Sequence, residues 1–108
     1  MPADNRLIVS VISPEATVYE GNASQVIAPA WDGQVGILPG HAPMLALVGS
    51  GALSIDRPGG GSDTFHVAGG VLKVERNQVT LLTEYAGAEA PAQVPASAIV
   101  YAEDVEGS

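Results

Sequence analysis

The sequence contains no cysteine, few basic residues and few aromatic residues. Without cysteine, its 108 residues cannot form disulfides, thiol nucleophiles or zinc–thiolate sites. Only 4 lysines and arginines stand against 12 acidic residues, which gives a formal net charge of −8. Nucleic acids and anionic lipids are therefore poor partners, because binding to either draws on lysine and arginine. A basic protein partner would suit this surface, although solubility alone explains the charge equally well.

Long hydrophobic runs are also missing. The first apolar run, Leu7 to Ile12, has six residues and is interrupted by Ser10. It is far shorter than the ~20 apolar residues that span a bilayer, and it lacks the pattern of a signal peptide. We therefore expect a soluble, intracellular chain. Hydrophobic residues still make up 46% of the sequence and aromatics only 5%, which predicts one packed domain with an aliphatic core.

The apolar residues that are present repeat with a period of two. Alternation of this kind occurs in five segments, residues 6–12, 33–38, 52–57, 64–70 and 71–86. The last segment reads as a hairpin, with Leu72 and Val74 facing inward, Lys73 and Glu75 facing outward, and Asn77 in the turn. Turn-forming residues separate the segments. This pattern predicts an all-β fold, an antiparallel sandwich or a flattened barrel.

The composition changes near residue 86. The residues beyond it are rich in alanine, proline and acids, and Ile99-Val100-Tyr101 is their only apolar cluster. We expect a folded domain over residues 1–86 and an Ala/Pro/acid-rich, mostly disordered tail over residues 87–108.

Two histidines are the candidate catalytic or metal-binding residues. His41 lies in the sequence PGHAP, where prolines and a glycine predict a tight turn, and Ser50 and Asp32 have no local means of reaching it. His66 lies in a strand, and a metal site would need the two imidazoles within about 4 Å of each other. A turn histidine and a solvated strand histidine are the simpler interpretations. The residues predict no catalytic, cofactor-binding or metal site.

Glycines and the single tryptophan favour a binding module over an enzyme. The run Gly59-Gly60-Gly61 joins two strands with no helix after it, which indicates a hairpin loop rather than a phosphate cradle. The pair Gly69-Gly70 suggests a bulge or a close approach of two backbones. Trp31 precedes the turn signal Asp32-Gly33, so it either folds back onto the domain or presents an anchor to a partner.

The order of the motifs is more specific than any single motif. The chain reads V-x-S-P-E at residues 11–15, DGQVGILPGHAP at 32–43, GGVLKV at 69–74 and NQVTLL at 77–82. In this order, over about residues 7–86, the motifs closely resemble the epsilon subunit of bacterial and chloroplast F-type ATP synthases. The resemblance implies a ten-stranded flattened β-sandwich that is non-catalytic and holds no cofactor or metal.

The resemblance also implies a place in the rotor's central stalk, where one sheet packs on the gamma subunit and loops touch the ring of c subunits. Such a subunit helps couple proton translocation to ATP synthesis. It lies at the cytoplasmic face of the bacterial inner membrane, as one copy in the complex and without inserting into the bilayer. The residues that match the partner-facing loops are Trp31, Asp32, Gly33, Gln34, Val35, Gly36, Gly40, His41, Ala42 and Pro43. Many relatives carry an acidic residue where this chain has Gln34, so no charged ring contact is implied there.

The chain departs from the family pattern at its C-terminal end. Family members typically continue into a helical hairpin that can block ATP hydrolysis, but only about twenty residues follow Tyr85, and Pro91 and Pro95 interrupt them. A helix pair needs about twice that length. We therefore expect coupling without this inhibition. Two other interpretations stay open, namely a small-ligand carrier with a dry concave pocket and a metal-assisted hydrolase that uses His41 and His66.

Overall fold

The computed structural model describes residues 6–89. Eight β-strands account for the regular secondary structure of this part of the chain. Their bounds are β1 (Leu7–Ile12), β2 (Thr17–Ala23), β3 (Gln25–Ala30), β4 (Gly33–Ile37), β5 (Met44–Leu47), β6 (Ser50–Asp56), β7 (Ser62–Glu75) and β8 (Gln78–Gly87). Between residues 6 and 89 no helix is long and apolar enough to cross a membrane.

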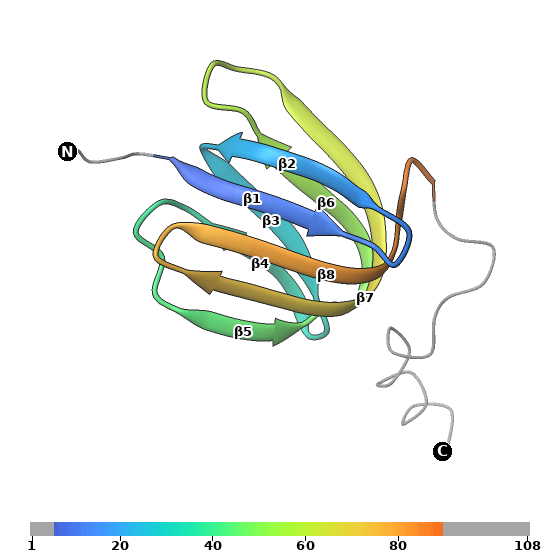
Figure 1. Ribbon diagram of the computed structural model, residues 1–108. Coiled ribbons are helices and arrows are strands. Elements are labelled where there is room, and N and C mark those ends of the chain that lie inside the picture. The colour runs from blue at the N-terminus through green and yellow to red at the C-terminus, as the bar shows by residue number, and fades with distance from the viewer. Residues whose placement is uncertain (1–5, 90–108) are drawn as a thin grey trace.

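The strands form two layers that share the long strand β7 (Figure 1). The first half of β7, residues 62–68, pairs with β6, and its second half, residues 71–74, pairs with β5. One layer contains β2, β1, β8, the second half of β7 and β5, and we call it the β8 layer. The other contains the first half of β7 with β6, β3 and β4, and we call it the β3 layer. The predicted sandwich is confirmed.

Strand β7 passes from one layer to the other at a pair of glycines. Gly69 and Gly70 have φ angles of 76° and 113°, which side chains disfavour. A Cβ atom on Gly70 would overlap the carbonyl oxygen of Leu82 and lie 2.7 Å from the Cα of Thr83. The β7–β8 register continues unchanged from the pair Ala68–Tyr85 to the pair Gly70–Thr83. The glycine pair therefore marks a close approach of two backbones, one of the two alternatives that the sequence suggested.

The number of strands differs from the ten that the resemblance implied, because the part of the chain that the structure describes has eight. One reason is that β7 runs through its glycine bend as one strand of 14 residues. The pairing is antiparallel throughout the described sheet except between β1 and β8, which run parallel from the pair Ile8–Gln78 to the pair Ile12–Leu82. This pair brings the first and last described strands together within one layer.

The core lies between the two layers and is aliphatic, as the composition predicted. Its buried members come from both layers and include Leu7, Val9, Val11, Val26, Ala28, Ile37, Leu53, Ile55, Val67, Leu72, Val74, Val79 and Leu81. The predicted hairpin is confirmed as well: Leu72 and Val74 are buried, and Lys73 and Glu75 are exposed. Its two turn residues, Arg76 and Asn77, have φ angles of 51° and 62°, as a two-residue type I′ turn requires.

The tail was predicted to begin at residue 87, but Gly87 is still part of β8, where it pairs with His66. Apart from residues 87–89, the tail lies outside the described residues, and so does the expected lack of a helical hairpin.

Candidate protein-interaction interface

The residues predicted to face a partner lie along one edge of the sandwich. Trp31 and Asp32 form the β3–β4 turn, residues 33–36 belong to β4, and residues 40–43 lie in the loop between β4 and β5. Strand β4 ends the strand order, and β5 pairs with β7 at the margin of the β8 layer (Figure 1). The two loops lie at opposite ends of β4 and do not form one cluster. We call the surface formed by β4, β5 and these two loops the β4–β5 edge.

The loop that carries His41 begins with a well-defined turn. The backbone N–H of His41 donates to the carbonyl of Leu38 at 3.0 Å. Pro39 and Gly40 occupy its central positions, and the φ angle of 88° at Gly40 matches a type II turn. The Nδ1 atom of His41 lies 2.7 Å from the carbonyl oxygen of Ala42. A carbonyl can only accept, so Nδ1 donates, and His41 is bonded within its own turn as the simpler interpretation predicted.

Trp31 is exposed rather than folded over the core. Trp31 is 50% exposed, and its backbone N–H donates to the carbonyl of Leu47 at 3.0 Å. A shallow pocket of about 230 Å³ lies beside it, lined in part by Gln34 and Gly49. Of the two alternatives that the sequence left open, the anchor fits this exposed position.

An apolar row crosses the outer face of the β8 layer, and sequence reasoning did not find it. Leu47 pairs with Val71, Val71 with Leu82, and Leu82 with Ile12, so these four residues lie side by side on four neighbouring strands. Each lies next to an inward-facing residue of its own strand, which places it on the outside. Leu47 and Leu82 are 53% and 52% exposed. We call these four residues the apolar row.

Beside the apolar row lie Lys73 and Thr80, and also Leu45, which is itself exposed. In the next register position Leu45 pairs with Lys73, and Lys73 pairs with Thr80. The Lys73 Nζ lies 3.9 Å from a carboxylate oxygen of Glu75, and both side chains are exposed. An apolar centre with a polar margin is the usual anatomy of a protein–protein interface.

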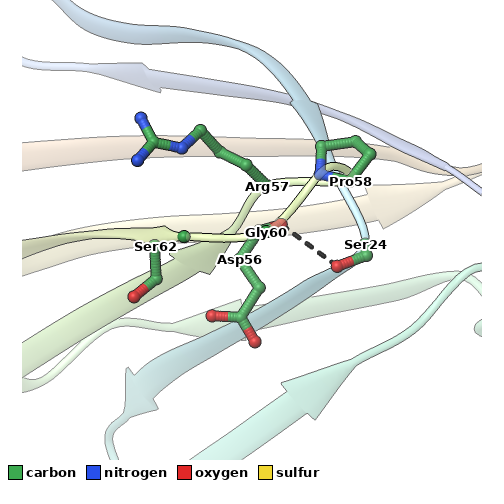
Figure 2. Close-up of a pocket in the computed structure, with 7 residues that line it drawn as sticks. Ser24, Asp56, Arg57, Pro58, Gly60 and Ser62 are labelled. Atoms are coloured by element: carbon green, nitrogen blue, oxygen red, sulfur yellow. Dashed lines mark hydrogen bonds between the residues drawn. The ribbon is translucent and has the colours of Figure 1, made fainter.

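A separate pocket of about 440 Å³ lies at the loop between β6 and β7. Figure 2 shows that Ser24, Asp56, Arg57 and Ser62 line it, and the Ser24 hydroxyl donates to the Asp56 carbonyl at 3.3 Å. Its lining carries both an acid and a base. This pocket is therefore not the dry concave site that a carrier of apolar ligands needs.

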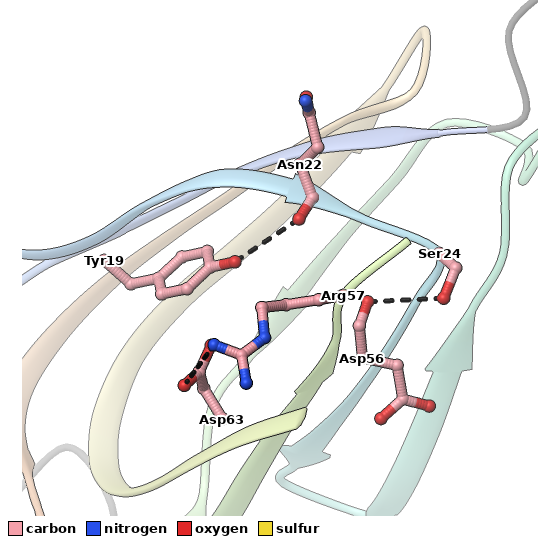
Figure 3. A network of polar contacts seen from close by, with 6 residues as sticks. All are labelled: Tyr19, Asn22, Ser24, Asp56, Arg57 and Asp63. Carbon is pink, nitrogen blue, oxygen red and sulfur yellow. Dashed lines mark hydrogen bonds and ion pairs between the residues drawn. The ribbon is translucent and has the colours of Figure 1, made fainter. Parts of the chain in front are cut away.

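Figure 3 shows the polar contacts around this loop and the neighbouring strand β2. Arg57 Nη1 lies 3.5 Å from the Asp63 carboxylate, and the Tyr19 hydroxyl donates to the Asn22 carbonyl at 3.3 Å. Burial, followed by the negative charge of Asp63, raises the pKa of Tyr19 above its ordinary value, and Arg57 opposes this shift. The bonds that cross from one segment to another are those of Ser24, whose N–H and hydroxyl both donate to the Asp56 carbonyl at the end of β6.

The two histidines belong to different surroundings. The Ser50 hydroxyl lies 3.3 Å from Nε2 of His66. Ser50 follows β5, whereas His41 lies in the loop before β5, so the two histidines are found near opposite ends of this strand. Asp32 lies in the β3–β4 turn. Among residues 6–89 no group of three or more histidine, cysteine or acidic side chains is placed to hold a metal ion. This arrangement gives the hydrolase interpretation no support.

Comparison with known proteins identifies the sandwich. The family model described as ATP synthase, Delta/Epsilon chain, beta-sandwich domain matches residues 6–89. The ATP synthase epsilon chain of Leptospira interrogans is 42% identical over 81 residues, which are 75% of this chain and 63% of that protein. The epsilon chain of Psychrobacter cryohalolentis is 38% identical over 76 residues, which are 70% of this chain and 55% of that protein. The chain thus spans 55–63% of the length of these relatives.

Solved structures agree with the fold. A chain of the Euglena gracilis mitochondrial ATP synthase (OSCP/F1/c-ring) superposes with a TM-score of 0.74 at 17% identity, covering 99% of this chain and 68% of that one. A chain from the central stalk and c-ring of the Tetrahymena thermophila mitochondrial ATP synthase superposes with a TM-score of 0.65 at 15% identity. The match covers 98% of this chain and 92% of that one. The match over the whole described sandwich means that this chain belongs to the ATP synthase delta/epsilon chain family through its β-sandwich domain.

Proposed function

We propose that this chain is a non-catalytic rotor subunit of an F-type ATP synthase, where it links the gamma subunit to the c-ring. In this role it carries torque between the proton-driven ring and the catalytic head. It works at the cytoplasmic face of the bacterial inner membrane, held there by the complex. Family membership over residues 6–89 and the apolar row together support the proposal.

The apolar row is the observation that carries the proposal. Two leucines that are more than half exposed, in register with two further aliphatic residues, form a strip that water solvates poorly. Such strips on isolated subunits are commonly covered by a partner. We assign the outer face of the β8 layer, with the apolar row at its centre, to the gamma subunit.

The β4–β5 edge is assigned to the c-ring. Leu47 of β5 belongs to the gamma-facing apolar row, so the c-ring is assigned the rest of this edge, which adjoins the row through β5. The exposed residues of β4 and its two loops include Trp31, Asp32, Gln34 and Leu38 beside several glycines, and this mixture of polar and apolar groups suits a smaller contact than the apolar row does. With this orientation both predicted loops touch the ring although they lie at opposite ends of β4.

Size-exclusion co-elution with the gamma subunit of the same organism tests the proposed function. We expect a stable one-to-one complex, because covering an apolar strip of this kind favours association. Separate elution of the two folded proteins would contradict the proposal. The charged lining of the pocket at the β6–β7 loop gives the carrier alternative no support.

A further inference from the structure

Asn77 makes contacts that its place in a hairpin turn does not require. Its backbone carbonyl accepts a hydrogen bond from the N–H of Ile8 at 2.8 Å, and its side-chain Oδ1 accepts one from the N–H of Gly40 at 2.7 Å. Gly40 is 37 residues away in the sequence. One residue therefore joins the start of β1, the β7–β8 turn and the loop that carries His41.

The second of these bonds satisfies a donor of the loop that its own turn does not use. In a type II turn the closing hydrogen bond joins the first and fourth residues, here Leu38 and His41. The N–H of the third residue, Gly40, takes no part in that bond. The Asn77 amide oxygen accepts it, and so ties the turn to the end of the β7–β8 hairpin, which is part of the β8 layer.

This bond fixes a loop that is otherwise open to solvent. Leu38 is 55% exposed, and Gly40, Ala42 and Pro43 are exposed as well. A loop that is already held in its bound conformation loses less conformational entropy when a partner docks. The loop's own prolines and the Asn77 bond both act in this direction, since proline restricts φ and the bond restricts the position of the whole turn.

We infer that Asn77 is a positioning residue that holds the Leu38–Pro43 loop ready for docking on the c-ring side of the rotor. The inference rests on the proposed function, because it takes the β4–β5 edge to be the ring-facing surface. It goes beyond that proposal by assigning a role to a residue outside the edge. Asn77 touches neither partner and acts through the loop.

The substitution Asn77→Gly distinguishes the role of the Asn77 side chain from the role of the turn itself. Glycine adopts positive φ angles readily, so the type I′ turn is retained while the acceptor for Gly40 is lost. Asn77→Asp is the matched control, because aspartate tolerates the same backbone conformation and keeps an acceptor oxygen at the same position. Three readouts are taken on the full chain: the Gly40 amide exchange rate, binding to gamma alone, and binding to a gamma–c-ring rotor.

For Asn77→Gly we expect faster exchange of the Gly40 amide, unchanged binding to gamma alone, and rotor binding that is weaker by about three- to tenfold, the usual effect of one lost hydrogen bond. We expect Asn77→Asp to keep both the exchange protection of the Gly40 amide and the rotor binding of the wild-type chain. Rotor binding equal to that of the wild type, or an equal loss of binding to gamma alone, would overturn the inference. Failure of the wild-type chain to bind gamma would instead overturn the proposed function, and the docking role of Asn77 with it.

Discussion

At the scale of single residues, Thr83 shows how the interior tolerates a polar group. Its side chain is buried opposite Gly70, and the carbonyl oxygens of Gly69 and Tyr85 lie 2.8 and 2.9 Å from its hydroxyl. The N–H of Tyr85 donates to the same hydroxyl at 3.4 Å. The hydroxyl thus bonds to backbone groups at the bend of β7, where Gly69 has no partner in the β7–β8 register.

Replacing Thr83 with valine keeps its shape and removes the hydroxyl. We expect Thr83→Val to lower the free energy of unfolding by about 1–2 kcal/mol, because the carbonyls at the bend stay buried and lose their donor. Urea denaturation measures the change. Thr80→Val, on the outer face of the same strand, is the control and should change stability by less than about 0.5 kcal/mol. Equal effects at the two positions would contradict the role given to the hydroxyl.

Tyr19 makes the free energy of unfolding depend on pH in the alkaline range. Its pKa is raised in the folded chain, so the folded state keeps the phenolic proton at pH values where the unfolded chain, with its ordinary pKa of 10.0, releases it. Stability from this group is therefore fully present below pH 10.0 and is lost as the pH rises through the folded-state pKa.

The variant Tyr19→Phe removes this titration and keeps the ring that packs edge-on against Phe65, with 6.2 Å between ring centroids. We expect a shallower loss of stability above pH 10.0 than in the wild-type chain. Thermal melting at a series of pH values compares the two chains. Parallel pH profiles would rule out Tyr19 as a source of the alkaline sensitivity.

At the scale of elements, the bend of β7 is the feature on which the sandwich depends. Val48 donates its N–H to the carbonyl of Gly70 at 2.9 Å, and Gly69 donates to the carbonyl of Gly49 at 3.1 Å, so the β5–β6 connection follows the bend closely. Strand β7 can therefore pair with β6 in one layer and with β5 in the other. Without the bend the two layers would lose their shared strand.

Gly70 is the residue that the bend tolerates least to change. Gly70→Ala places a methyl group against the backbone of β8 at a φ angle of 113°, so we expect a loss of at least about 3 kcal/mol of stability, or a chain that does not fold. Gly36→Ala on β4 is the matched control, because a Cβ there meets nothing within 4 Å. Chemical denaturation of both variants gives the comparison. A Gly70→Ala chain as stable as Gly36→Ala would contradict the close approach.

Elements were the part of the structure that the sequence predicted best. Alternation of apolar residues found the inward faces of β1, β6, β7 and β8, because each of those strands has one buried and one exposed face. The continuity of β7 was not predictable in the same way. A glycine pair ends a strand or bends it, and only the packing of β8 and the β5–β6 connection around Gly69-Gly70 decides which.

At the scale of the whole molecule, the proposed interface has two parts, and the sequence pointed to one of them. The motif order led to the β4–β5 edge because its residues are contiguous in the sequence. The apolar row could not be found in this way, because Ile12, Leu47, Val71 and Leu82 come together only through the registers of three strand pairs. In the sequence each of them is simply the outward residue of its own strand. Asn77 was predicted as a turn residue, but its bond to Gly40 also depends on how distant loops meet.

The central claim is that the apolar row docks on the gamma subunit. A binding titration of gamma against the wild-type chain, Leu82→Asp and Thr64→Asp tests it most directly. Thr64 is exposed on β7 in the β3 layer, so the second variant adds the same charge away from the row. We expect Leu82→Asp to weaken binding by at least about 30-fold, since about 2 kcal/mol is typical of a central interface residue, and Thr64→Asp to bind like the wild type. Equal affinity of all three chains for gamma, with each chain folded, would contradict the claim.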